Sequence, residues 1–218
     1  MATVDEGEME VCTSSLSVEQ ALQFYYSDVN IIGTEKFGET VVLSFNRLGS
    51  RIRFGFYERL EGMGVKDLVF SVSGKFMTKA QYRLSDQGIT LVGSTESSSM
   101  DVPSLPGPIQ ADKSNLLEGR DVTGWIPVLP MKDSELSITI ESCTFTQDNT
   151  ANTMVLVEPI MVPVPERYRY WDTNKDYSYI FQISNVQEDF NHIIFSFDQQ
   201  IVRDWVDNGA EGIYDFQP

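Results

Sequence analysis

The sequence predicts an all-β protein that is built from two antiparallel β-sandwich domains. Apolar residues recur with a period of two: Ile52, Phe54 and Phe56 fall on one face of a strand, and residues 136–140 alternate in the same way. This alternation is typical of half-buried strands. Gly, Pro, Asn and Asp residues separate the runs, as expected of the turns in a sandwich.

In the first half of the chain, one short helix and three strands are expected. Residues 17–20 (Ser-Val-Glu-Gln) have the form of a capping box and predict the helix, although the aromatic residues 24–26 that follow read equally well as a strand. Strands are then expected at 41–45, 52–56 and 65–70.

Serine, proline and glycine crowd between residues 93 and 115, where the apolar periodicity stops. Such a composition is typical of a linker. The chain is therefore expected to divide into an N-terminal domain at 1–112 and a C-terminal domain at 113–218. In the second domain, strands are expected at 136–141, 177–184 and 193–198, and Pro165 is well placed to begin a helical turn that reaches Trp171.

The second half carries a specific series of motifs. A proline-ended strand precedes a polar-alternating strand, a V-P-x-x-Y-x-x-W turn, an asparagine and the strand Y-S-Y-I-F-Q-I-S. The residues that carry these motifs are Trp125, Pro130, Val164, Pro165, Tyr168, Trp171, Asn174, Tyr177, Tyr179 and Phe181. Over residues 122–201 this pattern resembles the C-terminal half of a fimbrillin, the subunit family of type V pili on Gram-negative gut and oral anaerobes. The chain departs from it at Gln182, where the family usually has Lys, and at Asp172-Thr173, where Lys-Pro is common.

The resemblance implies transthyretin-like, Greek-key sandwiches and a structural role without catalysis or cofactor. It implies a structural subunit or a tip- or anchor-like component of a cell-surface fimbria, associated with the outer membrane and supporting adhesion. The implied partners are other fimbrial subunits, joined by β-strand addition, and a host or bacterial surface ligand. Family stalk subunits lose an N-terminal stretch by cleavage after a basic residue, whereas the first basic residue here is Lys36.

Two segments are candidates for a donor or edge strand, because their apolar residues alternate and an open sheet edge pairs with such a strand. The first segment, residues 8–14, presents Met9, Val11 and Thr13 on one face. The second segment, residues 193–202, presents Ile193, Phe195 and Phe197.

The chain has 32 acidic and 16 basic residues among 218, which gives a net charge of −16. This charge disfavours binding to nucleic acid and to anionic lipid. No stretch approaches the roughly 20 apolar residues of a membrane span, so the chain itself is not expected to insert into a membrane. Residues 1–10 do not form a signal peptide, and the resemblance then implies that a targeting segment has been removed.

Metal and catalytic motifs are weak. Asp172, Asn174 and Asp176 have the spacing of a calcium loop, but Tyr177 and Ile183 stand where an EF-hand needs Gly and Glu, which favours a polar turn and leaves only an irregular calcium site open. The single histidine and two cysteines, Cys12 and Cys143, disfavour a zinc site. Two unpaired thiols are expected, and a disulfide stays open as the alternative.

Several residues could act as a catalytic acid or base, but they do not form a recognisable catalytic motif. These are the carboxylates Asp198, Asp204, Asp207, Glu211 and Asp215 together with His192. Carboxylates near the chain end are expected to form a solvated surface, and a lone histidine is more often structural.

Exposed aromatic residues would favour a different function, a non-catalytic carbohydrate-binding module of a surface glycan-utilisation system. Tyr177 and Tyr179 fall on one face of their strand, which suits a sugar-stacking platform and suits a core equally well. Packing in the core is the favoured interpretation.

Overall fold

Two facing β-sheets form the body of the protein, and the all-β prediction is confirmed. The computed structural model describes residues 2–5, 8–11, 16–17, 25–27, 45–60, 63–85, 88–100, 102, 105, 109–147, 153–156, 158–186 and 189–205. Helix is confined, within these residues, to α2 (Ser114–Leu117) and the 3-10 turn η2 (Glu166–Tyr168). The strands are β1 (Ala2–Asp5), β2 (Glu8–Val11), β3 (Leu16–Ser17), β4 (Tyr25–Ser27), β5 (Phe45–Arg47), β6 (Ser50–Arg59), β7 (Met63–Ser85), β8 (Gly88–Met100), β9 (Ile126–Val128), β10 (Ser137–Gln147), β11 (Thr153–Val155), β12 (Ile160–Pro163), β13 (Lys175–Val186) and β14 (Asp189–Asp204).

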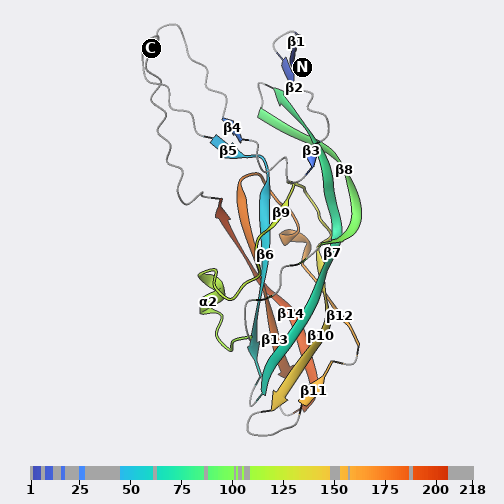
Figure 1. Cartoon of the computed structure of the whole chain (residues 1–218), viewed down its shortest axis with the longest axis vertical. Coiled ribbons are helices and arrows are strands. Elements are labelled where there is room, and N and C mark those ends of the chain that lie inside the picture. The colour runs from blue at the N-terminus through green and yellow to red at the C-terminus, as the bar shows by residue number, and fades with distance from the viewer. Residues whose placement is uncertain are drawn as a thin grey trace.

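The larger sheet has six strands, in the order β11-β10-β7-β3, with β12 also paired to β10 and β8 to β7. The other sheet has the order β14-β13-β6-β9. Its central pair, β6 and β13, is parallel, whereas β13–β14 and β6–β9 are antiparallel. Two small pairs, β1–β2 and β4–β5, complete the described strands, and the long β7–β8 hairpin extends along one side of the molecule towards β1 and β2 (Figure 1).

The division at residue 112 stays a prediction, but described strands from both sides of it share both sheets. β6 pairs with β13 from Arg51 opposite Asp176 onward, and β7 pairs with β10. The prediction of a linker is wrong for residues 93–100, because they continue β8 in antiparallel pairing with β7. Residues 95–99 are exposed, and a strand held by backbone hydrogen bonds does not need an apolar face where no core lies against it.

The core lies between the sheets and uses the alternating residues that the sequence predicts. Ile52, Phe54 and Phe56 are buried, as are Ile138 and Ile140 on the facing sheet. Aromatic contact crosses the gap at β7, because the Phe54 ring lies 5.8 Å from that of Phe70, measured between centroids. Within the four-stranded sheet, Phe54 lies 5.7 Å from Tyr179 and Phe56 lies 5.4 Å from Phe181, so aromatic pairs also join β6 to β13. Such contacts add to the stabilisation from burial itself.

A smaller apolar cluster covers the opposite face of the four-stranded sheet. Leu116 of α2 and Val122 pack there against Tyr57 and Ile180. The segment can approach because Gly55 has no side chain: a Cβ at this position would lie 2.9 Å from Val122 Cγ1 and 3.0 Å from Leu116 Cδ2. This approach explains a glycine in the middle of a central strand.

Local predictions have mixed outcomes. Ser17 belongs to β3 and residues 18–24 lie outside the described residues, while Tyr25 and Tyr26 form β4, so the alternative of a strand is confirmed there. The turn after Pro165 is helical, as predicted, but it consists of η2 alone and ends at Tyr168, so it does not reach Trp171. Of the strand expected at 41–45, only Phe45 is described, and it begins β5.

Candidate functional site

The C-terminal candidate segment lies at an edge of the four-stranded sheet. It belongs to β14, whose only strand partner in the described part of the chain is β13. The pairing places Phe195 opposite Ile183 and Phe197 opposite Phe181, with a register shift between Ile180 and Phe181. One backbone edge of this 16-residue strand therefore has no strand partner among the described residues.

The side chains of β14 anchor it in its own sandwich. Phe195 is only 9% exposed, and Ile193 and Phe197 pack partly buried against the same core. The Phe197 ring lies 5.7 Å from that of Phe181 and 4.9 Å from that of Tyr168. β14 is thus fixed through its side chains, while its outer backbone edge has no strand partner in the part of the chain that the structure describes, which suits an acceptor of a strand better than a donor.

The N-terminal candidate segment is paired within its own region. Met9 lies opposite Val4 and Val11 lies opposite Ala2 in the β1–β2 hairpin, and Thr13 lies outside the described residues. Donation of residues 8–11 to another copy would first require β2 to leave β1.

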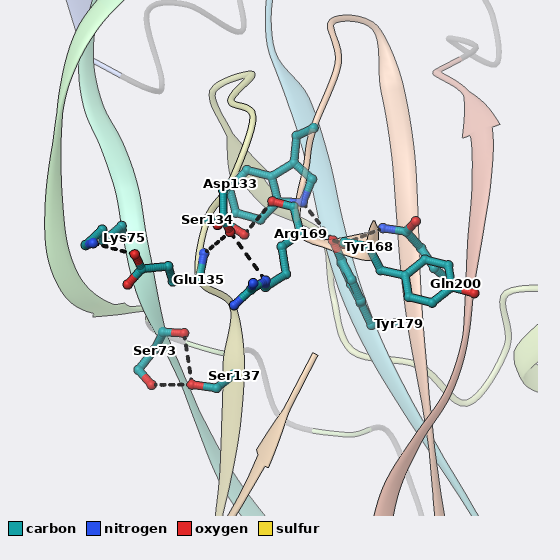
Figure 2. Close-up of polar contacts among 11 residues, drawn as sticks. Ser73, Lys75, Asp133, Ser134, Glu135, Ser137, Tyr168, Arg169, Tyr179 and Gln200 are labelled. Atoms are coloured by element: carbon teal, nitrogen blue, oxygen red, sulfur yellow. Dashed lines mark hydrogen bonds and ion pairs between the residues drawn. The ribbon is translucent and has the colours of Figure 1, made fainter. Parts of the chain in front are cut away.

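A hydrogen-bond network ties the motif turn to both sheets (Figure 2). Trp171 Nε1 donates to the Tyr179 hydroxyl at 2.8 Å, and that hydroxyl donates to the Tyr168 carbonyl at 2.9 Å. Gln200 of β14 donates to the same carbonyl at 3.0 Å. Burial raises the pKa of Tyr179, so this phenol stays a neutral donor over a wide pH range.

The turn before β10 closes on the same motif. The hydroxyl of Ser134 donates to the Arg169 carbonyl at 2.8 Å, and the backbone carbonyl of Ser134 accepts from the backbone N–H of Lys75 at 2.7 Å. Lys75 also pairs with Glu135, and Arg169 with Asp133 at 3.3 Å (Figure 2). Val164, the first residue of the motif, is buried, and Pro165 after it is exposed.

The predicted polar turn is confirmed at residues 172–176, because β13 begins at Lys175. Asn174 has a φ of 57°, a conformation that asparagine tolerates better than most residues. Its Oδ1 accepts from the backbone N–H of Arg47 and its Nδ2 donates to Asn46 Oδ1. No cluster of three or more potential metal ligands occurs among the described residues.

The candidate acid–base residues do not form one group where the structure describes them. Asp198 pairs with Lys113 at 2.8 Å, Asp204 pairs with Lys175 at 2.5 Å, and His192 is exposed. Asp207, Glu211 and Asp215 lie outside the described residues.

The two tyrosines that could have formed the carbohydrate-binding platform are buried. Tyr177 and Tyr179 are 0% exposed and Trp171 is 2% exposed. Tyr25 and Tyr170 are exposed, but they lie on β4 and in the motif turn, far apart in the sequence. The favoured interpretation of Tyr177 and Tyr179 as core residues is confirmed.

Sequence reasoning missed a ladder of alternating arginine and aromatic side chains at the outer face of the four-stranded sheet. Its order is Tyr25, Arg47, Trp205, Arg51, Trp125 and Arg53. From the guanidinium carbon of Arg47, the ring centroids of Tyr25 and Trp205 lie 4.6 and 4.5 Å away. From that of Arg51, the centroids of Trp205 and Trp125 lie 4.4 and 4.3 Å away. The Arg53 carbon lies 4.0 Å from the Trp125 centroid. The sequence does show that Arg51 and Arg53 alternate with the core residues of β6 and therefore lie on its outer face. The positions of Trp125 and Trp205 beside these arginines depend on how the strands pair, which the sequence does not show.

Two of the three arginines of the ladder are also fixed by polar contacts. Arg51 makes two hydrogen bonds to the Asp176 carboxylate, at 2.6 and 2.9 Å. Arg53 donates to Ser178 Oγ at 2.8 Å, and burial lowers its pKa. These two contacts follow from the parallel register of β6 and β13, which sets Arg51 opposite Asp176 and Arg53 opposite Ser178.

No protein-family model matches the chain, and no curated protein matches its sequence. Among solved structures it is similar to a fimbrial protein from Bacteroides vulgatus ATCC 8482, with a TM-score of 0.47 and 13% identity over 75% of this chain and 56% of that one. It is also similar to a "putative cell adhesion protein" from Parabacteroides distasonis ATCC 8503 (TM-score 0.42, 10% identity, 72% and 52% covered) and another from Bacteroides uniformis ATCC 8492 (0.38, 16%, 76% and 54%).

The chain spans about half the length of these solved structures. Any function proposed for the chain must rest on its own strands and contacts. No described helix is long and apolar enough to cross a membrane.

Proposed function

We propose that this protein is an adhesion-related component of a cell-surface fimbria and that the outer edge of β14 accepts a strand from a neighbouring subunit. The observation that carries the proposal is the combination of a long strand at a sheet edge with side chains locked into the core. An unpaired edge presents backbone N–H and C=O groups in a fixed row, and an added strand satisfies them.

The packing of β14 supports an acceptor role. Phe195 and Phe197 hold the strand against β13 and the facing sheet, so an incoming strand meets an ordered template and loses less entropy on binding. The burial of Tyr177 and Tyr179 removes the main support for a sugar-binding platform. A non-enzymatic subunit at the outer membrane surface, with other subunits as partners and a surface ligand for adhesion, is the function proposed.

The test places charge on the edge strand without touching the core. Ile194 and Val202 are both exposed on β14, at 45% and 44%, and lysine on an edge strand is a common means of blocking strand addition. The variant Ile194→Lys/Val202→Lys is compared with wild type by light scattering over a concentration series. We expect wild type to form larger species with rising concentration and the variant to stay monomeric.

The double variant Val69→Lys/Val155→Lys is the matched control, because both residues are exposed and lie on the other sheet, in β7 and β11. It makes the same charge change away from β14 and should associate like wild type. A synthetic peptide of residues 8–14 serves as a probe strand, and a gain in thermal stability that is lost in the β14 variant would identify that segment as a donor. A wild-type protein that stays monomeric at every concentration and ignores the peptide would refute strand addition at β14.

A further inference from the structure

Trp205 directly follows β14, and its indole ring lies between two guanidinium groups. The ring centroid is 4.5 Å from the guanidinium carbon of Arg47 and 4.4 Å from that of Arg51. The backbone N–H of Trp205 donates to the Asn174 carbonyl at 2.9 Å, and the N–H of Asn174 donates to the Gly49 carbonyl at 3.0 Å. The C-terminal end of the edge strand is therefore joined to the segment between β5 and β6.

We propose that Trp205 is a positioning residue, held by the arginine ladder, which keeps the C-terminal end of β14 in the sheet so that its outer edge can receive a strand. The second half of this proposal rests on the proposed function of the edge. The first half, that the ladder fixes the end of β14, stands on the contacts alone.

The end of an edge strand is the part of a sheet that opens most easily, because it is held by backbone hydrogen bonds on one side only. Val202, Arg203 and Asp204 are all exposed at this end of β14, so their burial contributes little to holding it. The Lys175–Asp204 ion pair and a hydrogen bond from Arg203 to the Leu117 carbonyl are exposed contacts at this end, and two cation–π contacts to Trp205 add to them. Opening of β14 from this end would have to break both cation–π contacts.

The residues that contact the indole ring are held in place by contacts that do not involve Trp205. The two hydrogen bonds from Arg51 to Asp176 fix the plane of one guanidinium, and Trp125 packs on the other face of that guanidinium at 4.3 Å. Arg53 closes the series against Trp125, held by Ser178. A planar guanidinium held in this way favours an aromatic ring over an aliphatic side chain of similar bulk.

Hydrogen exchange of the full chain tests this directly. Trp205→Leu keeps apolar bulk without a π face, whereas Trp205→Phe keeps a smaller π face. In Trp205→Leu we expect the amides of residues 199–204 to exchange about tenfold faster, the loss expected of two partly exposed cation–π contacts. Trp205→Phe should be intermediate, and the amides of β7 and β10 should not change. Tyr170→Ala, which removes an exposed aromatic outside the ladder, is the control.

Unchanged exchange at 199–204 in Trp205→Leu, or equal effects of the Leu and Phe variants, would overturn the ladder as the device that fixes β14. Light scattering then separates this result from the proposed function. If Trp205→Leu opens the strand but the variant associates as strongly as wild type, Trp205 fixes the end of β14 without serving strand addition, and the second half of the proposal is wrong. If wild type itself does not associate, the proposed function fails and the role in strand addition with it, while the exchange data still decide whether Trp205 fixes β14.

Discussion

The hydroxyl of Tyr179 gives a sharp prediction for stability. Tyr179→Phe removes one oxygen that accepts from Trp171 Nε1 at 2.8 Å and donates to the Tyr168 carbonyl at 2.9 Å. The carbonyl keeps a donor in Gln200, at 3.0 Å. The indole N–H loses the acceptor that Tyr179 provided, and because Trp171 is only 2% exposed, water cannot easily replace that acceptor.

A buried donor that is left unsatisfied costs about 1–3 kcal/mol of unfolding free energy. For a chain of this length each kcal/mol lowers Tm by roughly 2–4 °C. The matched control is Tyr57→Phe, which deletes the same group where the acceptor, Gln182 Oε1 at 2.8 Å, belongs to a half-buried side chain that water can reach. We expect Tyr57→Phe to cost less than about 1 kcal/mol.

Urea unfolding followed by circular dichroism measures both variants, and Trp171→Phe with the double variant Trp171→Phe/Tyr179→Phe completes a double-mutant cycle. The double variant should be less destabilised than the sum of the two single variants by about 1 kcal/mol, because it leaves no orphaned indole. Equal losses in Tyr179→Phe and Tyr57→Phe, with an additive double variant, would show that the network does not contribute in this way.

Two further predictions concern titrating groups. Burial raises the pKa of the Cys143 thiol to about 11. In a Cys12→Ser variant, the Cys143 thiol should therefore resist a thiol reagent at pH 8 while the protein is folded and react once the protein is unfolded. Rapid labelling of the folded variant would contradict this prediction. Burial likewise raises the pKa of Tyr177 to about 12, whereas an unfolded tyrosine ionises near pH 10. Between these pH values the unfolded state binds fewer protons than the folded state, so the free energy of unfolding should fall as pH rises from about 10 to 12. Urea unfolding at several pH values measures this free energy, and phenolate absorbance follows the ionisation. A free energy of unfolding that does not change over this pH range would contradict the prediction.

The faces of the strands could be predicted from the sequence, but their partners could not. Alternation identifies Ile52, Phe54 and Phe56 as core residues because the strand period is two. The same alternation is satisfied whichever strand lies next to β6, so the parallel pairing of β6 with β13, across more than 120 residues, has no local signal. The serine-rich part of β8 was missed for the related reason that its exposed side chains have no apolar period.

The candidate site was predictable to a similar extent. Ile193, Phe195 and Phe197 were expected to share a face, and they do, yet only the sheet order reveals that β14 lies at an edge. To predict the arginine ladder, one would have to know three separate strand or backbone pairings, which bring Trp125, Trp205 and Tyr25 next to β6 and β5. None of them can be read from spacing along the chain.

The charge of the protein also bears on where copies can meet. With a net charge of −16, two copies repel each other over most of their surfaces. Along β14 this repulsion is reduced, because Asp198 is paired with Lys113 and Asp204 with Lys175, and the neighbouring ladder adds arginines. Strand addition itself uses backbone groups that carry no net charge. The edge of β14 is therefore a place where an otherwise acidic molecule can bring a second chain close with little electrostatic cost, as the proposed strand addition would require.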